Sequence, residues 1–196
     1  VLGFVLFATG AAFAFLAFGH VRQRVNVWLD PFGDEGDTSY QIAQSLYGFA
    51  SGGMFGSGLG QGYPQLVPYA KSDFIIAAFG EEIGLIGVAA MLVLYAIIVQ
   101  RGMRSAIACR DIFGTLLASG LSIVLALQVF VVIGGVTRLI PLTGLTTPFL
   151  SQGGSSLVAN WIAIALLMRI SDAARRPDTD TSAAALEDAP TQAVRL

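Results

Sequence analysis

The sequence predicts an all-α polytopic membrane protein, and three observations lead to that class. Of the 196 residues, 55% are hydrophobic and only 12% are charged, whereas ordinary soluble domains carry about 25% charged residues. Mean hydropathy is +0.71. Stretches at 1–18, 74–99 and 112–136 are long enough to cross about 30 Å of hydrocarbon as helices. A fourth stretch, 155–170, is shorter and can span if its flanking residues snorkel.

These stretches divide the chain into alternating spans and loops. The expected order is a transmembrane helix at 1–19, an extracytoplasmic loop at 20–72, a transmembrane helix at 73–99, a cytoplasmic loop at 100–111, a transmembrane helix at 112–137, an extracytoplasmic loop at 138–154, a transmembrane helix at 155–171 and a disordered cytoplasmic tail at 172–196. The sides follow from arginines crowded in the short loop (Arg101, Arg104, Arg110) and after the last span (Arg169, Arg175, Arg176). Four spans enclose little, so we expect a piece of a larger membrane protein.

Charge and cysteine content exclude several classes of function. A formal net charge of −2 is too balanced to indicate nucleic-acid binding. The single cysteine excludes an internal disulfide and a multi-cysteine metal site. The first span lacks a basic region ahead of it, so it does not resemble a signal peptide.

The loop 20–72 is too long to be only a connector, which indicates a functional segment. Tyr40, Ala43, Tyr47 and Ala50 fall on one helical face, so we expect an amphipathic helix at 39–50 lying along the membrane surface. Next, 51–62 carries six glycines in twelve residues. This segment is either a flexible tether or a backbone lining for an extended substrate, and its spacing does not separate the two.

Asp73 is the most informative residue, because it stands at the mouth of an apolar span. An ionised group beside or inside the bilayer is costly and is by default a functional-site hypothesis. Glu81 and Glu82 follow further along the span, where we expect them to pair with polar groups inside the bundle. Gln128 and Asn160, inside later spans, are expected to join helices to one another.

The loop 138–154 is apolar and carries two prolines, which prevent a continuous helix. Irregular backbone at membrane depth is tolerated only where protein or water covers it. Gly153, Gly154, Ser155 and Ser156 then open the last span. Free amides and the helix dipole there suit an anion such as phosphate, while capping by Ser155 or Ser156 is the alternative.

Four motifs in series resemble the SEDS family (shape, elongation, division and sporulation), whose members include RodA and FtsW. The matching strings are YQIAQSL at 40–46, GSGLG at 56–60, DFI at 73–75 with GEEIG at 80–84, and LIPLTGLTTPF at 139–149 with GGSS at 153–156. The resemblance covers 25–172 in the family's order and spacing. It implies that this chain is the C-terminal portion, four spans of a larger bundle of about ten helices.

The resemblance implies a peptidoglycan glycosyltransferase of the bacterial plasma membrane, which polymerises lipid-linked disaccharide-peptide (lipid II) into glycan strands for elongation or division. Asp73 matches the family's essential aspartate, on the extracytoplasmic face. A partly desolvated carboxylate there has a raised pKa and suits a general base that deprotonates the acceptor hydroxyl. The substrate-binding residues that we expect are Gln65, Lys71, Arg138, Ser151, Gly153, Gly154, Ser155 and Ser156.

Cofactors and partners also follow only from the resemblance. It implies a divalent cation, Mg²⁺ or Mn²⁺, although the sequence shows no ligand set. The implied partners are lipid II, undecaprenyl-pyrophosphate-linked glycan, membrane lipid and a class B penicillin-binding protein as transpeptidase. Departures occur at Tyr63, Gln65 and Gln152, where the family commonly has Lys, Glu and Tyr, so the auxiliary residues need not act identically.

Two other functions remain open at this stage. The bundle could be a lipid II flippase, although its polar residues gather at one face rather than at the midplane. It could also be a non-catalytic membrane scaffold for a transpeptidase. The sequence does not separate elongation from division. We expect the fragment alone to be inactive, because about half of the substrate groove lies in other helices.

Overall fold

The computed structural model describes residues 1–33, 36–68 and 70–176, and these residues form helices joined by turns and loops. The helices are α1 (Leu2–Ala17), α2 (Gly19–Leu29), α3 (Asp37–Gly52), the 3₁₀ turn η1 (Pro64–Leu66), α4 (Ile75–Ala108), α5 (Ile112–Val136) and α6 (Gly154–Arg175). The described residues contain no strand, which confirms the all-α class. The predicted tail begins too early, because α6 continues to Arg175; the rest of it, 177–196, lies outside the described residues.

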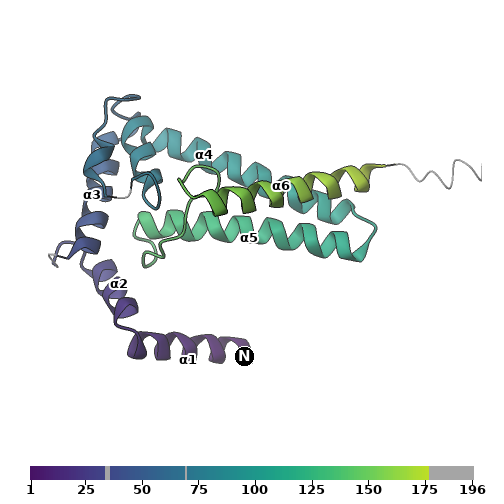
Figure 1. Cartoon of the computed structure of the whole chain (residues 1–196), viewed down its shortest axis with the longest axis horizontal. Coiled ribbons are helices and arrows are strands. Elements are labelled where there is room, and N and C mark those ends of the chain that lie inside the picture. The colour runs from purple at the N-terminus through teal and green to yellow at the C-terminus, as the bar shows by residue number, and fades with distance from the viewer. Residues whose placement is uncertain (34–35, 69, 177–196) are drawn as a thin grey trace, which may run out of the picture.

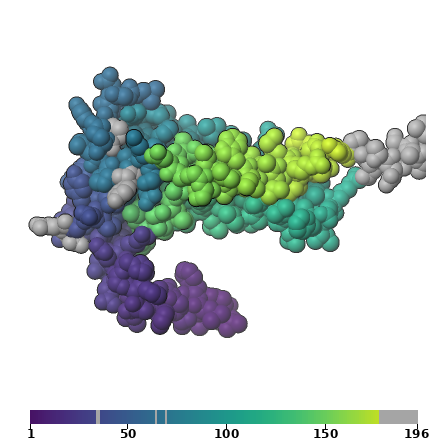
Figure 2. Space-filling model, viewed as in Figure 1, coloured from purple at the N-terminus to yellow at the C-terminus, as the bar shows by residue number. Residues whose placement is uncertain are grey.

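Helices α4, α5 and α6 lie side by side and form the body of the molecule (Figure 1). By length and composition all three can cross a membrane, and the bent pair α1 and α2 makes a fourth span if it counts as one. The bend between α1 and α2 is 99°. No residue of α1 is buried, and Figure 2 shows this helix standing away from the body.

The connection between α4 and α5 is shorter than predicted. The expected loop 100–111 is helical through Ala108, because Arg101 and Arg104 extend the helix past the apolar stretch with exposed side chains. Asp111 then caps α5, where its Oδ2 accepts a hydrogen bond from the Gly114 N–H at 2.9 Å.

Helix α3 forms where the amphipathic pattern predicted a helix, and it packs against α4 through small residues. Its buried positions are Ser39, Ile42, Ser45, Gly48 and Gly52. The tyrosine face is exposed instead, with Tyr40 at 52% and Tyr47 at 57%. A Cβ on Gly52 would stand 2.0 Å from the Gly80 carbonyl oxygen, so only glycine permits this approach. Contact of the exposed face with a membrane surface stays a prediction.

The glycine-rich segment repairs a break in α4. At Gly84 the backbone leaves helical geometry, with φ 74°. Residues 53–58 supply the missing partners: Ser57 N and Gly58 N donate to the carbonyls of Glu81 and Glu82 at 2.9 and 3.0 Å, and the Gly53 carbonyl accepts from Leu85 N at 3.0 Å. The flexible-tether interpretation of this part is therefore wrong, while a substrate lining stays a prediction.

The loop between α5 and α6 folds back into the bundle, as its apolar, proline-broken sequence predicts. Tyr95 of α4 donates through its hydroxyl to the Pro148 carbonyl at 2.5 Å, and Gln128 Nε2 of α5 donates to the Thr146 carbonyl at 3.1 Å. Gln128 was expected to join two helices, but it binds the loop instead.

Asn160 was also expected to join two helices. Its Nδ2 instead donates to the Ser156 carbonyl of its own helix at 2.9 Å. Each side-chain amide thus donates to a backbone carbonyl, Gln128 to one in the loop and Asn160 to one in its own helix. Their positions in the sequence did not predict these partners.

Candidate functional site

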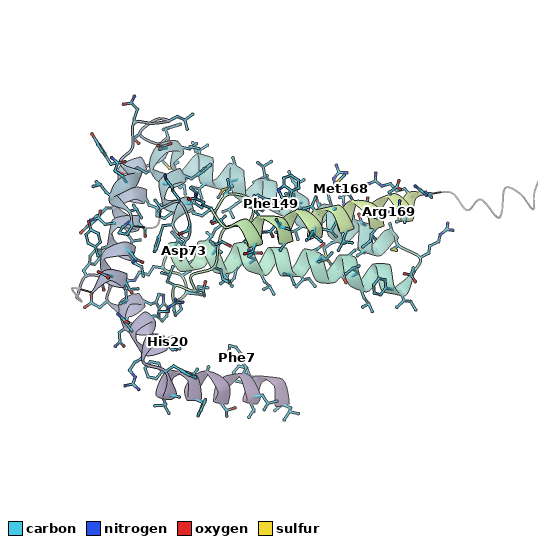
Figure 3. All side chains as sticks on the ribbon, viewed as in Figure 1. Phe7, His20, Asp73, Phe149, Met168 and Arg169 are labelled. Atoms are coloured by element: carbon cyan, nitrogen blue, oxygen red, sulfur yellow. The ribbon has the colours of Figure 1, made fainter. Side chains whose placement is uncertain are left out.

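Asp73 lies in the turn that leads into α4, at the end of the bundle where α3 crosses it (Figure 3). The next residue, Phe74, is 1% exposed and fixes the turn in a core with Val27, Ile42 and Val136. Since that core joins α2, α3 and α5, the position of Asp73 depends on packing between elements that are far apart in sequence.

Hydrogen bonds join the turn before Asp73 to the segment that precedes α6. Ser151 Oγ donates to the Ser72 carbonyl at 2.5 Å and accepts from the Thr147 N–H at 2.7 Å. Gln152 N donates to the Lys71 carbonyl at 2.8 Å. Ser151 therefore supports the turn that carries Asp73; its contact with substrate stays a prediction.

The Asp73 carboxyl is half-buried, and burial raises its pKa above the ordinary value. A hydrogen bond from the Ser72 side chain and the positive charge of Arg24 act in the opposite direction with smaller effect. A raised pKa brings a carboxylate closer to neutral pH, where it is a better general base than an exposed aspartate.

Arg24 is the residue that sequence reasoning missed. Its Nη1 donates to the carbonyls of Leu142 and Thr143 at 3.1 and 2.8 Å, which brings the guanidinium next to the loop between α5 and α6. A Cβ built on Gly144 would lie 3.4 Å from Arg24 Nη2 and 3.6 Å from Asp73 Oδ2. An arginine in a long loop gives no local signal of this proximity, because only the folding of α2 against the later loop creates it.

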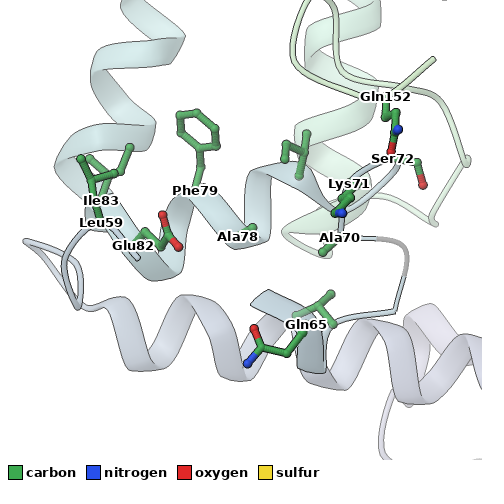
Figure 4. Close-up of a pocket in the computed structure, with 12 residues that line it drawn as sticks. Leu59, Gln65, Ala70, Lys71, Ser72, Ala78, Phe79, Glu82, Ile83 and Gln152 are labelled. Carbon is green, nitrogen blue, oxygen red and sulfur yellow. The ribbon is translucent and has the colours of Figure 1, made fainter. Parts of the chain in front are cut away.

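A cavity of about 690 Å³ adjoins the turn and contains two of the predicted substrate residues, Gln65 and Lys71 (Figure 4). Ser72, Glu82 and Gln152 complete its polar lining, and most of the remaining wall is apolar. Asp73 is not part of the wall and follows directly after Ser72. A mostly apolar hollow with a few polar groups is typical of ligand sites.

Arg138 is engaged by the backbone of α2. Its Nε and Nη2 donate to the carbonyls of Trp28 and Leu29 at 2.7 and 2.6 Å, and its own carbonyl accepts from Trp28 Nε1 at 3.0 Å. A cation at the last carbonyls of a helix is favourable. Arg138 thus holds the C-terminal end of α2, and its contact with substrate stays a prediction.

The start of α6 has no side-chain cap. Gly153 is the N-cap residue, Ser155 is exposed, and Ser156 Oγ accepts from Thr146 Oγ1 at 2.8 Å. The alternative of capping by Ser155 or Ser156 is therefore wrong. Anion binding by Gly153, Gly154 and these serines stays a prediction.

Glu81 has the structural role that was expected of it. It is 6% exposed, and its Oε1 accepts from the Tyr63 N–H at 2.9 Å. Within the described residues there is no group of three or more His, Cys, Asp or Glu side chains that could hold a metal. Mg²⁺ is commonly held by one or two carboxylates together with substrate phosphates, so the divalent cation that the resemblance implies stays a prediction.

Comparison with known proteins gives a consistent set of similarities. The family model FTSW_RODA_SPOVE, described as cell cycle protein, matches residues 1–176. Over 177 residues the chain is 63% identical to the peptidoglycan glycosyltransferase RodA of Mycobacterium bovis, covering 90% of this chain and 38% of that protein. Over 174 residues it is 40% identical to the probable peptidoglycan glycosyltransferase FtsW of Geobacter sp., covering 87% of this chain and 47% of that protein. The chain thus spans less than half the length of these relatives.

Two solved structures share the fold. One, from a study of the structural coordination of polymerization and crosslinking by a peptidoglycan synthase complex, has a TM-score of 0.71 and 27% identity over 90% of this chain and 48% of its own. The other, a mutant of the rod shape determining protein RodA of Thermus thermophilus, has a TM-score of 0.53 and 31% identity over 69% of this chain and 42% of its own.

Proposed function

The chain belongs to the FtsW/RodA/SpoVE family of multi-pass membrane proteins, and from that premise we propose that the full-length protein is a peptidoglycan glycosyltransferase. It polymerises lipid II into glycan strands, with Asp73 as the general base. The names of the relatives support the activity, since one is named peptidoglycan glycosyltransferase RodA and another probable peptidoglycan glycosyltransferase FtsW. The observation that carries the proposal is the half-buried carboxyl of Asp73, whose pKa burial raises, beside a cavity at the end of the bundle.

The reaction needs one base and no second catalytic carboxylate. The acceptor C4 hydroxyl attacks the anomeric carbon of the donor sugar, the bond from that carbon to the lipid pyrophosphate breaks, and Asp73 takes the hydroxyl proton. Paired carboxylates serve glycosidases, which must also protonate a poor leaving group. A pyrophosphate leaves as an anion and benefits from nearby positive charge, for which Lys71 lines the adjoining cavity.

The remaining assignments belong to the same proposal. The site lies on the extracytoplasmic face of the plasma membrane, where lipid-linked precursor and growing glycan meet. A class B penicillin-binding protein crosslinks the product; a neighbour that takes part in a peptidoglycan synthase complex with coordinated polymerization and crosslinking supports a transpeptidase partner. The divalent cation implied by the resemblance stays a proposal without a ligand set in the described residues.

The test is Asp73→Asn in the full-length protein, assayed for polymerisation of purified lipid II. We expect the rate to fall by about 10²–10⁴-fold, the usual contribution of general base catalysis. Asp37→Asn is the matched control, because Asp37 is an exposed aspartate in the first turn of α3 and should retain wild-type activity. Burial disfavours the ionised form of Asp73, so the neutral isostere should fold at least as well, as thermal unfolding would show.

The two other functions predict different results. If the protein were a flippase, the wild-type protein would translocate lipid II in vesicles without making polymer. A scaffold would make Asp73→Asn silent and would lose transpeptidase binding only through substitutions on its lipid-facing surfaces. Normal polymer from Asp73→Asn would refute the general-base assignment.

A further inference from the structure

Two reciprocal arginine contacts fix α2 against the loop between α5 and α6. Arg24 of α2 donates to the Leu142 and Thr143 carbonyls, and Arg138 of the loop donates back to Trp28 and Leu29. Each guanidinium bonds two carbonyls, at distances between 2.6 and 3.1 Å. Hydrogen bonds to charged donors are stronger than neutral ones. The guanidinium of Arg24 therefore has a defined position even though its side chain is exposed.

That position faces Asp73 across a glycine. The point where a Cβ would sit on Gly144 is within 3.4 Å of Arg24 Nη2 and 3.6 Å of Asp73 Oδ2, and the glycine itself has φ +71°. A side chain at 144 would be strained and would also stand between the two charges. Among the described residues Arg24 forms no direct ion pair with Asp73. The carboxylate oxygens are thus influenced by the cation without being occupied by it.

We propose that Arg24 is a positioning residue for the reaction at Asp73: clamped to the 142–143 carbonyls, it holds a fixed positive charge across Gly144 from the carboxylate. This inference rests on the proposed function. The Asp73 carboxylate then experiences two opposing effects: burial increases its proton affinity, and the positive charge of Arg24 decreases it. The carboxylate is then basic enough to accept a proton while remaining ionised before the acceptor arrives.

Other charged groups near the turn do not replace Arg24. Lys71 and Glu82 line the adjoining cavity, and Arg138 is held by the end of α2. The charge that opposes the effect of burial on the pKa of Asp73 is that of Arg24. Removing the Arg24 charge therefore leaves burial opposed only by the Ser72 hydrogen bond.

The test is Arg24→Gln in the full-length protein, with kcat/KM for lipid II polymerisation measured against pH. Without the cation the acid limb of the profile moves to higher pH, so the loss of rate is greatest at acid pH and shrinks as pH rises. Arg24→Lys restores the charge and should bring the limb back toward its wild-type position. Arg22→Gln is the matched control, because Arg22 lies on the same helix and bonds the Leu16 carbonyl; its limb should not move.

A second readout does not depend on turnover. Infrared difference spectra of wild type against Asp73→Asn isolate the titration of this carboxyl, and Arg24→Gln should displace that titration to higher pH. An unmoved titration in a folded Arg24→Gln protein would overturn the inference while leaving the proposed function intact. Conversely, a displaced titration in Arg24→Gln, together with a wild-type protein that makes no polymer, would refute the proposed function and retain the electrostatic coupling.

Discussion

At the scale of single residues, the surroundings of Asp73 set both its access to a ligand and its proton affinity. Asp73 is half-buried and directly follows Ser72, which lines a cavity, and burial raises its pKa. Ser72 and Arg24 oppose that effect without cancelling it. An aspartate in such surroundings can exchange a proton nearer to neutral pH than an exposed one.

The pH dependence of polymerisation follows from this direction. A general base acts in its ionised form, so activity should be present above the raised pKa of Asp73 and should be lost as pH falls through it. We expect the acid limb of kcat/KM to lie above the ordinary aspartate range of about 3.9. Measuring initial rates of lipid II polymerisation by the full-length protein across the acid range checks this. An acid limb within the ordinary range would show that burial does not tune the base.

At the scale of elements, the glycines of α3 and its following loop decide how α4 presents the turn. Gly52 lets α3 touch the α4 backbone, and residues 53–58 replace the hydrogen bonds that α4 loses at Gly84. The part of α4 before Gly84 is thereby held in place, and Asp73 lies in the turn just before it. Glycine content alone left a flexible tether and a substrate lining equally open, whereas the fold uses these glycines for close approach between two backbone segments.

A substitution at Gly52 tests that packing. The Cβ of Gly52→Ala would meet the Gly80 carbonyl oxygen at 2.0 Å and the Glu81 backbone at 2.8 Å, and backbone cannot yield as a flexible side chain can. We expect a loss of about 1–3 kcal/mol in the free energy of unfolding, as for other overpacked sites, and weaker polymerisation because the part of α4 before Gly84 shifts.

Ser51→Ala is the matched control on the same helix. Ser51 is exposed, and its hydroxyl bonds only the Gly48 carbonyl one turn earlier, so its loss should leave stability nearly unchanged. Thermal unfolding of both variants in detergent measures the difference. Equal stability of Gly52→Ala and wild type would contradict the packing described for α3 and α4.

At the scale of the whole molecule, apolar length predicts the spans and little of their detail. The stretches 74–99 and 112–136 became α4 and α5 because a run of that length has few alternatives to a membrane helix. The break at Gly84 was not predicted, because an isolated glycine is usually tolerated in a helix. For the loop 138–154 the sequence predicted irregular backbone covered by protein or water, but it did not predict the partners Tyr95 and Gln128.

Some residues of the candidate site could be predicted from the sequence, and others could not. Asp73 stood out because a charge beside an apolar span is costly in itself. Gln65 and Lys71 were drawn from family resemblance, and the fold places both in one cavity. Arg24 could not be found from the sequence, because its relation to Asp73 depends on α2 meeting a loop far along the chain.

The account as a whole requires that the Asp73 carboxylate reaches the acceptor sugar. The most direct measurement is a structure of the full-length protein, as Asp73→Asn to prevent turnover, with lipid-linked acceptor and donor bound. We predict that the residue 73 side chain lies about 2.6–3.2 Å from the acceptor C4 hydroxyl, or one water away from it. An acceptor bound elsewhere, with that hydroxyl facing another carboxylate, would contradict the assignment of Asp73 as the base.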